Sequence, residues 1–225
     1  MPDIRKRDSR SASFLLVGAT SGIGAAMADK LVENGAKVIA VGRRQERLDA
    51  FAKKHGSIKA ASIRFDITDR AGLDGFVNRV VDEFLGLDCD KVIPTGLIIT
   101  GTHLSLIPAV TLPAYSASKA ALHTYVYSLR QQLQGSSTKI STKIIEILAP
   151  LMQIEFHDYI GKEQGRSMGM PVDVFADEKY KQLVLGTEHI LVGSVGPEEP
   201  FLELFKARQK QLDDLSNFML SLPPG

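Results

Sequence analysis

The sequence predicts an α/β domain built on a doubly wound, mainly parallel sheet. Short apolar runs of four to six residues recur along the chain, and segments of helical length separate them. Most runs are continuously apolar rather than alternating, which is typical of parallel strands covered by helices on both faces. One connection is too short for this pattern, so we expect the sheet to depart from it at that point.

A glycine-rich turn joins the first strand, residues 14–17, to a helix that ends at Asn34-Gly35. We expect this strand to be buried on both faces. Glycines at such a turn let backbone N–H groups and a helix dipole approach a phosphate, and the last one lets the helix pack closely on the strand. A tight turn without a ligand would need the same glycines. The candidate phosphate-binding residues are Gly18, Thr20, Ser21, Gly22, Ile23 and Gly24.

The end of the second strand, residues 37–41, indicates the preferred nucleotide. In a dinucleotide-binding fold this point meets the adenosine ribose, where an acid binds a 2′-hydroxyl and an arginine accommodates a 2′-phosphate. Here Gly42 is followed by Arg43 and Arg44 and by no acid, so the sequence favours NADP(H). The alternative is that both arginines are solvated charges in front of a helix over residues 45–54.

A third strand, residues 60–65, ends in Asp66-Ile67-Thr68. Asp66 and Ile67 are candidate cofactor-binding residues, Asp66 through a hydrogen bond to the adenine edge. Asp66 or Thr68 could equally cap the N-terminus of the helix that the pattern predicts over residues 70–85.

Composition limits the classes of partner. The 225 residues fit one domain, which we place at 14–220 behind a polar, disordered tail at 1–13. The net charge of +1 gives no reason to expect nucleic acid or an anionic membrane as a partner. No apolar run approaches the roughly 18 residues of a membrane span. The single cysteine, Cys89, excludes an internal disulfide framework and suits a reducing compartment, so we expect a cytoplasmic protein without a bound metal.

The connection between residues 87–89 and 97–100 is the anomaly of the chain. Both stretches have the composition of strands, yet only seven residues, 90–96, lie between them. Parallel neighbours need a crossover of roughly a dozen residues or more. The fourth strand is therefore absent, or the segment is irregular, or it pairs antiparallel.

Tyr115 and Lys119 lie four residues apart on one face of a helix that runs to about Leu133. A phenol has a pKa of about 10, which is too high for easy proton exchange near neutrality, and a nearby ammonium lowers it. A core tyrosine beside a lysine that reaches solvent would give the same spacing.

Together these segments resemble the short-chain dehydrogenase/reductase family over roughly residues 14–193. The matching motifs, in the family's order, are GATSGIG (18–24), VGRR (41–44), DIT (66–68), PAYSASKAALH (113–123) and IIEILAP (144–150). The resemblance implies a Rossmann-type fold, NADP(H) as the cofactor, and an oxidoreductase that interconverts a carbonyl and an alcohol on a small organic substrate.

The resemblance also implies residue roles. Tyr115 would exchange a proton with the substrate oxygen as hydride moves to or from the nicotinamide, and Lys119 would bind the nicotinamide ribose and lower the tyrosine pKa. Thr102, thirteen residues before Tyr115, stands where the family has a serine that holds the substrate carbonyl, and Ser105 is a second candidate. Pro150 matches the family residue beside the nicotinamide ring.

The chain departs from the family at its short connection. The family's N-A-G segment and the long helix after it, which carries a catalytic asparagine, are missing, a deficit of roughly 40 residues. The resemblance therefore implies a sheet that lacks or rearranges one central strand and one crossover helix. This helix usually forms part of a dimer interface, so a homo-oligomer is only a candidate assembly. The chain is either a shortened form or a member that closes its sheet differently. The alternative function is a catalytically impaired nucleotide-binding or interaction protein.

The C-terminal third predicts strands over residues 144–148 and 189–192 and a helix over 172–185. An amphipathic helix over 201–218 follows, which we expect to cover the core or an oligomer surface. By the resemblance, residues 152–166 include a mobile loop over the substrate, to which Gly161, Gly165 and Gly169 supply flexibility. Glu155 stands where the family has a threonine that binds the carboxamide.

Overall fold

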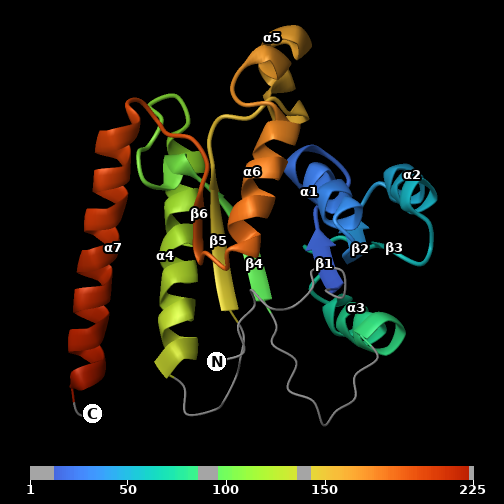
Figure 1. Ribbon diagram of the computed structural model, residues 1–225, viewed down its shortest axis with the longest axis horizontal. Helices are drawn as coiled ribbons and strands as arrows, with labels where there is room; N and C mark the ends of the chain where they lie inside the picture. Colours follow the sequence, from blue (N-terminus) through green and yellow to red (C-terminus); the bar gives the residue numbers. More distant parts are fainter. Residues whose placement is uncertain (1–12, 86–95, 136–142, 223–225) are drawn as a thin grey trace. The chain divides into compact units, whose positions relative to one another are not determined.

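The computed structural model describes residues 13–85, 96–135 and 143–222. The chain divides into two compact units, each built from two stretches of sequence. The first unit consists of Met1–Val92 and Leu151–Thr187, and the second of Ile93–Pro150 and Glu188–Gly225. Each unit contains a three-stranded parallel sheet with helices packed on it (Figure 1). The prediction of an α/β fold with a mainly parallel sheet is confirmed, while a single domain over 14–220 stays a prediction.

In the first unit the strand order is β1-β2-β3, and every pairing is parallel. Its elements are β1 (Ser13–Val17), α1 (Gly22–Glu33), β2 (Lys37–Gly42), α2 (Gln45–His55), β3 (Ala60–Arg64), α3 (Leu73–Val80), the π-helical turn η3 (Val81–Leu85), the 3-10 helix η5 (Glu155–Ile160), α5 (Lys162–Ser167) and α6 (Val172–Val184).

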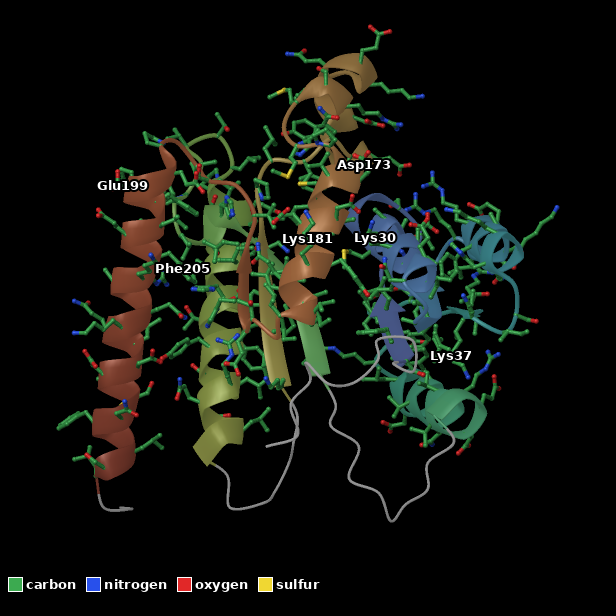
Figure 2. The ribbon with its side chains drawn as sticks, viewed as in Figure 1. Lys30, Lys37, Asp173, Lys181, Glu199 and Phe205 are labelled. Atoms are coloured by element: carbon green, nitrogen blue, oxygen red, sulfur yellow. The ribbon has the colours of Figure 1, made fainter. Side chains whose placement is uncertain are left out.

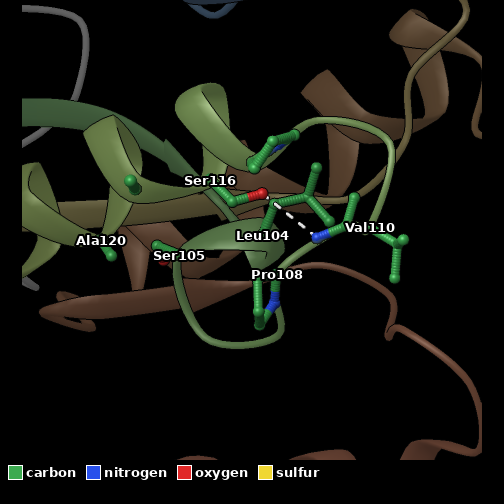
Figure 3. A pocket seen from close by; sticks show the side chains of 9 residues that line it. Leu104, Ser105, Pro108, Val110, Ser116 and Ala120 are labelled. Carbon is green, nitrogen blue, oxygen red and sulfur yellow. Dashed lines mark hydrogen bonds between the residues drawn. The ribbon is translucent and has the colours of Figure 1, made fainter.

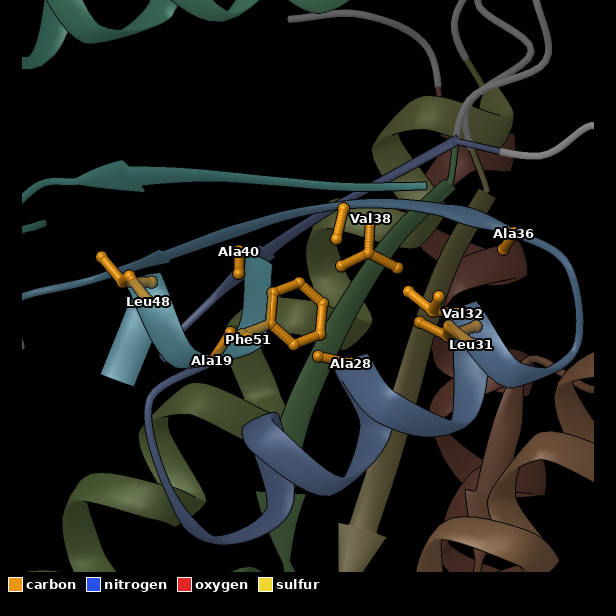
Figure 4. Packing of buried hydrophobic residues seen from close by; sticks show 10 residues of the cluster. Ala19, Ala28, Leu31, Val32, Ala36, Val38, Ala40, Leu48 and Phe51 are labelled. Atoms are coloured by element: carbon orange, nitrogen blue, oxygen red, sulfur yellow. The ribbon is translucent and has the colours of Figure 1, made fainter. Parts of the chain in front are cut away.

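Alternate residues of β2 point to opposite faces of this sheet, and helices cover both faces. Val38 and Ala40 pack in a cluster with α1 and α2, to which Phe51 contributes the largest side chain (Figure 4). Ile39 and Val41 belong to a second cluster with residues of α3. The sheet of the first unit is therefore doubly wound, as the continuous apolar run of β2 predicts.

The expectation that β1 is buried on both faces is wrong. Leu15 is 42% exposed and Val17 is 47% exposed, whereas the last five residues of β2 are buried. Among the described residues β1 pairs only with β2, so it is an edge strand. The apolar run predicted the strand correctly, but burial of both faces also requires elements packed on each of them.

The second unit has the strand order β4-β5-β6, again parallel. Its elements are β4 (Gly96–Thr102), the 3-10 helix η4 (His103–Ser105), α4 (Pro113–Gly135), β5 (Lys143–Ala149), β6 (His189–Leu191) and α7 (Glu198–Ser221). The ring centroid of Phe201 lies 4.7 Å from that of His103, and the ring centroid of Phe205 lies 5.7 Å from that of His189. These contacts hold the first half of α7. Figure 2 shows Phe205 on the side of α7 toward α4. Phe218, near the other end of the helix, is 60% exposed.

The two sheets are separate within the described residues, where β1 pairs only with β2 and β4 only with β5. This agrees with the prediction that one central strand is absent or rearranged. The candidate strand at 87–89, with Cys89, and most of the short connection lie outside the described residues. In the part of the chain that is described, no helix is long and apolar enough to cross a membrane.

Helix α6 packs on α1 within the first unit and buries a lysine. Lys30 of α1 forms an ion pair with Asp177 of α6. Lys179, two residues further on, has no exposed surface, and its Nζ lies 4.1 Å from the centroid of the Phe175 ring. Within the described residues this Nζ has no hydrogen-bond acceptor. Burial lowers the pKa of Lys179 to about 7.

Stability should therefore rise with pH in a way that depends on Lys179. Between pH 7 and the ordinary lysine pKa of 10.5, the unfolded chain holds a proton that the folded chain lacks. The free energy of unfolding should rise across this window by at most about 1.4 kcal/mol per pH unit, and the rise should be smaller in Lys179→Met. Urea unfolding at several pH values measures it, with Lys181→Met, at a side chain 69% exposed, as the matched control. Equal slopes in Lys179→Met and the wild type would contradict the argument.

Candidate nucleotide and acid-base sites

The glycine turn after β1 is held against β2. The N–H groups of Gly18 and Ala19 donate to the carbonyl oxygen of Val41, at 2.9 and 3.1 Å. Gly18 has φ +82°, a conformation that favours glycine. A Cβ on Gly24 would overlap the carbonyl oxygen of Gly18, so Gly24 allows α1 to approach the turn as closely as it does.

Helix α1 begins at Gly22 with Ser21 at its N-cap position, and Ser21 makes no side-chain capping hydrogen bond. The first N–H groups of any α-helix have no acceptor within the helix and carry the positive end of its dipole. Ile23 lies half-buried in this first turn. Ile154, from the segment before η5, lies over the turn, because a Cβ on Gly22 would be 3.4 Å from its Cγ2.

Arg44 reaches back from the end of β2 to the glycine turn. Its Nε donates to Thr20 Oγ1 at 3.2 Å, and its Nη2 donates to Ser21 Oγ. Its Nη1 donates to Glu155 Oε2 at 3.1 Å. The structure thus brings together three of the sequence-predicted cofactor residues, Thr20, Ser21 and Arg44, in one cluster.

Arg47 completes this cluster and is absent from the sequence-predicted residues. Its Nη1 donates to the carbonyl oxygen of Thr20 at 3.1 Å, and its Nη2 donates to Glu155 Oε1 at 2.8 Å. Hydrogen bonds from Arg47 and then Arg44 lower the pKa of Glu155. The available signal was the spacing of Arg44 and Arg47, three apart at the start of a predicted helix. We call Thr20, Ser21, Arg44 and Arg47 the arginine site.

Arg43 and Asp66 lie apart from the hydrogen bonds of the arginine site. The Arg43 side chain is 77% exposed and lies 3.8 Å from Asp66 Oδ2. Asp66 Oδ1 accepts from the N–H and the hydroxyl of Thr68, at 3.0 and 2.8 Å, and these bonds lower its pKa. Ile67 is 53% exposed.

The capping role considered for Asp66 or Thr68 is wrong. Helix α3 begins at Leu73 rather than at residue 70, and Gly72 is its N-cap. Asp69 Oδ1 accepts from the N–H of Gly72 at 3.1 Å, so the local turn is closed by a different aspartate.

Tyr115 and Lys119 share one face of α4, as their spacing predicts. The Nζ of Lys119 lies 5.7 Å from the centroid of the Tyr115 ring. Burial raises the pKa of Tyr115, so the lowering expected from Lys119 is wrong for the protein alone. The cause of this rise is the loss of solvation around the phenol.

Thr102 and Ser105 are both buried at the carboxyl end of β4. Thr102 Oγ1 accepts from the N–H of Leu104 at 3.3 Å, and Ser105 Oγ donates to the carbonyl oxygen of Thr102 at 2.7 Å. These bonds hold η4, which packs against α4 in the same unit. Pro150 directly follows β5 and is half-buried.

An apolar pocket of about 370 Å³ lies beside the first two turns of α4 (Figure 3). Its lining combines the loop after η4 with one stripe of α4, and Ser116 accepts a hydrogen bond from the N–H of Ala109 at 3.1 Å across it. The lining residues are Leu104, Ser105, Pro108, Ala109, Val110, Pro113, Ser116, Ala117 and Ala120.

A buried charged network lies further along α4. His123 Nδ1 donates to both carboxylate oxygens of Glu146 on β5, at 2.9 and 2.8 Å. Arg130 Nε donates to the carbonyl oxygen of Ile144 at 3.0 Å, and its guanidinium also contacts His189. Burial, followed by the charges of Arg130 and His123, lowers the pKa of His189 to about 3. This network fixes α4 on β5 and β6.

The flexibility expected from Gly161, Gly165 and Gly169 stays a prediction, and two of these glycines also allow close packing. A Cβ on Gly165 would overlap the carbonyl oxygen of His157, and one on Gly169 would overlap that of Leu151. These glycines permit close backbone packing around η5 and α5. The described residues contain no group of three or more metal-ligating side chains.

Comparisons with known proteins agree with this geometry. A family model described as short chain dehydrogenase matches residues 13–89. Serine 3-dehydrogenase from Agrobacterium fabrum is 42% identical over 78 residues, which are 35% of this chain and only 31% of that enzyme. An uncharacterised oxidoreductase from Staphylococcus epidermidis is 25% identical over 171 residues, covering 57% of this chain and 74% of that protein.

Solved structures share the fold. A short-chain dehydrogenase from Sphingobium yanoikuyae in complex with NADPH has a TM-score of 0.71 at 18% identity, covering 91% of this chain and 96% of that one. A serine dehydrogenase complexed with NADP⁺ has a TM-score of 0.67 at 17% identity, covering 83% and 98%. Together these comparisons confirm the resemblance to the short-chain dehydrogenase/reductase family, which in sequence is carried by residues 13–89 with their glycine turn.

Proposed function

We propose that this chain is an NADP(H)-dependent oxidoreductase that interconverts a carbonyl and an alcohol on a small organic substrate. The observation that carries the proposal is the placement of Tyr115 and Lys119 together on one face of α4. It is supported by the family match, which covers the glycine turn and the end of β2. The relatives that match are dehydrogenases or oxidoreductases, but the first of them aligns over less than a third of its length.

The residues of the first unit fit a phosphorylated dinucleotide. The uncapped start of α1 offers N–H donors to an anion. Thr20 and Ser21 supply hydroxyl groups, and Arg44 and Arg47 supply two guanidinium groups whose planar donors suit a phosphate. In the proposed roles the pyrophosphate is contacted by Gly18, Gly22, Ile23 and Gly24. The adenosine end is contacted by Arg43, Arg44, Asp66 and Ile67. The nicotinamide end is contacted by Lys119 and Pro150.

The residues of the second unit would handle the substrate. The bound nicotinamide would supply or accept a hydride. Tyr115 would exchange a proton with the substrate oxygen, and Thr102 would hold that oxygen through its hydroxyl. Burial raises the pKa of the Tyr115 phenol, so it holds the proton that it would donate to a carbonyl in the direction of reduction. The apolar pocket beside α4 would take a small organic group.

Titration calorimetry of the purified chain with NADPH and with NADH tests the cofactor assignment. We expect NADPH to bind with a Kd in the range of about 1–100 μM and more tightly than NADH, because the arginine site offers charge-assisted hydrogen bonds to a 2′-phosphate. Preference for NADH would contradict the NADP(H) assignment. No binding of either nucleotide would contradict the proposed function as a whole.

A second candidate is a nucleotide-binding or interaction protein without turnover. The observation that favours it is the separation of the sheets, since β1 and β4 each have one strand partner among the described residues. Nucleotide binding without reduction of any carbonyl compound, in a screen that includes aldehydes, ketones and oxo acids, would support this candidate over the enzyme.

A further inference from the structure

We propose that Glu155 is an internal competitor for the phosphate of the arginine site, and that it thereby sets how strongly the protein prefers NADP(H) over NAD(H). This inference rests on the function proposed above. It concerns a carboxylate that comes from a different part of the chain, after β5, and that bridges both guanidinium groups of the site.

Glu155 lies between the two guanidinium groups of the arginine site. Glu155 Oε2 lies 3.1 Å from Arg44 Nη1, and Oε1 lies 2.8 Å from Arg47 Nη2. Each carboxylate oxygen thus takes one guanidinium, which is how two oxygens of a phosphate would be held. The same two arginines contact the glycine turn through Thr20. The carboxylate therefore occupies the acceptor position that a phosphate beside this turn would need.

The charges of the arginine site match a phosphate better than a carboxylate. Two guanidinium groups face one carboxylate, so the arginine site with Glu155 keeps an excess of positive charge. A phosphomonoester carries a charge of about −1.5 to −2 at neutral pH, which matches the two arginines better than a single carboxylate does. The Glu155 side chain is 35% exposed, so it can leave the site without opening a buried core. A 2′-phosphate can displace it but must break its two ion pairs.

Glu155 and its neighbour Ile154 affect nucleotide binding in different ways. Ile154 lies over Gly22, where any dinucleotide would place its pyrophosphate, so it affects NADPH and NADH alike. In the proposed assignment the arginine site takes the 2′-phosphate, so Glu155 opposes the ligand that carries one. The ratio of the two affinities therefore separates the effect of Glu155 from that of Ile154.

The test measures the binding of 2′,5′-ADP and 5′-AMP by titration calorimetry, in the wild type and in Glu155→Gln. The two probes differ by the 2′-phosphate. We expect Glu155→Gln to bind 2′,5′-ADP about tenfold more tightly, because two part-exposed charge-assisted bonds no longer have to be broken. We expect the affinity for 5′-AMP to change by less than about twofold. Arg47→Met should weaken 2′,5′-ADP binding and leave 5′-AMP unaffected.

Asp158→Asn is the matched control. Asp158 also lies in η5 and pairs with Arg166 at 2.8 Å, so its replacement removes one negative charge from the same segment but not from the arginine site. Its affinities should equal those of the wild type. Unchanged or weaker binding of 2′,5′-ADP by Glu155→Gln would overturn the competitor role while leaving the proposed function intact. Failure of the wild type and Glu155→Gln to bind either probe or NADPH would overturn both.

Discussion

Replacing Tyr115 with phenylalanine should lower kcat by about a thousandfold while leaving NADPH affinity nearly unchanged. Proton transfer by a positioned side chain contributes roughly 10²–10⁴-fold to a rate, and phenylalanine keeps the ring but has no proton to transfer. The ring beside Lys119 is preserved, so cofactor contacts of that lysine should persist. The measurement is steady-state reduction of a carbonyl substrate, with calorimetry of NADPH binding on the same preparations.

Tyr125→Phe is the control for this experiment, because Tyr125 lies on the same helix and is 62% exposed. It should retain wild-type turnover. Full activity in Tyr115→Phe would show that another group protonates the substrate oxygen. Loss of NADPH binding together with activity would point instead to a role of Tyr115 in holding the cofactor.

Glu146→Ala should lower the free energy of unfolding by about 3–5 kcal/mol, the usual effect of removing one partner from a buried ion pair. Glu146 has no exposed surface, and the His123 side chain that donates to it is nearly as buried. Alanine would leave the donor of His123 without its acceptor and would also open a cavity. Urea unfolding followed by circular dichroism measures the change.

Two further variants separate the charge from the packing. Glu188→Ala removes a carboxylate that lies 3.9 Å from Arg130 but is 39% exposed, so we expect a loss below about 1 kcal/mol. The double variant His123→Leu/Glu146→Leu replaces both polar partners with apolar groups and should be more stable than Glu146→Ala, because the donor of His123 is removed together with its acceptor. A double variant less stable than Glu146→Ala would mean that packing dominates at this site.

The arrangement of strands and helices could be predicted from the sequence because it depends on local patterns. The run of apolar residues in β2 and the glycines before α1 each specify their own element. The same locality explains why Arg44 could be chosen as a cofactor residue, since it directly follows a strand. Its contact with Thr20 and Ser21 then follows from the pairing of β1 with β2, which holds the glycine turn against the end of β2.

Other features depend on partners that are distant in the sequence. Arg47 and Glu155 are 108 positions apart, and no local pattern connects them. The exposure of Leu15 depends on which elements pack on its face of the sheet. The raised pKa of Tyr115 depends on how much solvent the folded chain removes from the phenol, which the spacing of Tyr115 and Lys119 does not specify.

The interleaving of the two units has a consequence for how the chain can be made and divided. Helix α6 belongs with α1, but the residues that separate them build most of the second unit, including β4 and β5. During synthesis the packing of α6 on α1 must therefore wait until those strands have left the ribosome. No contiguous fragment consists of one complete unit alone, and a chain cut short after β3 would leave α1 without its neighbouring helix. A single cut between α4 and β5 would leave pieces that only non-covalent contacts hold together.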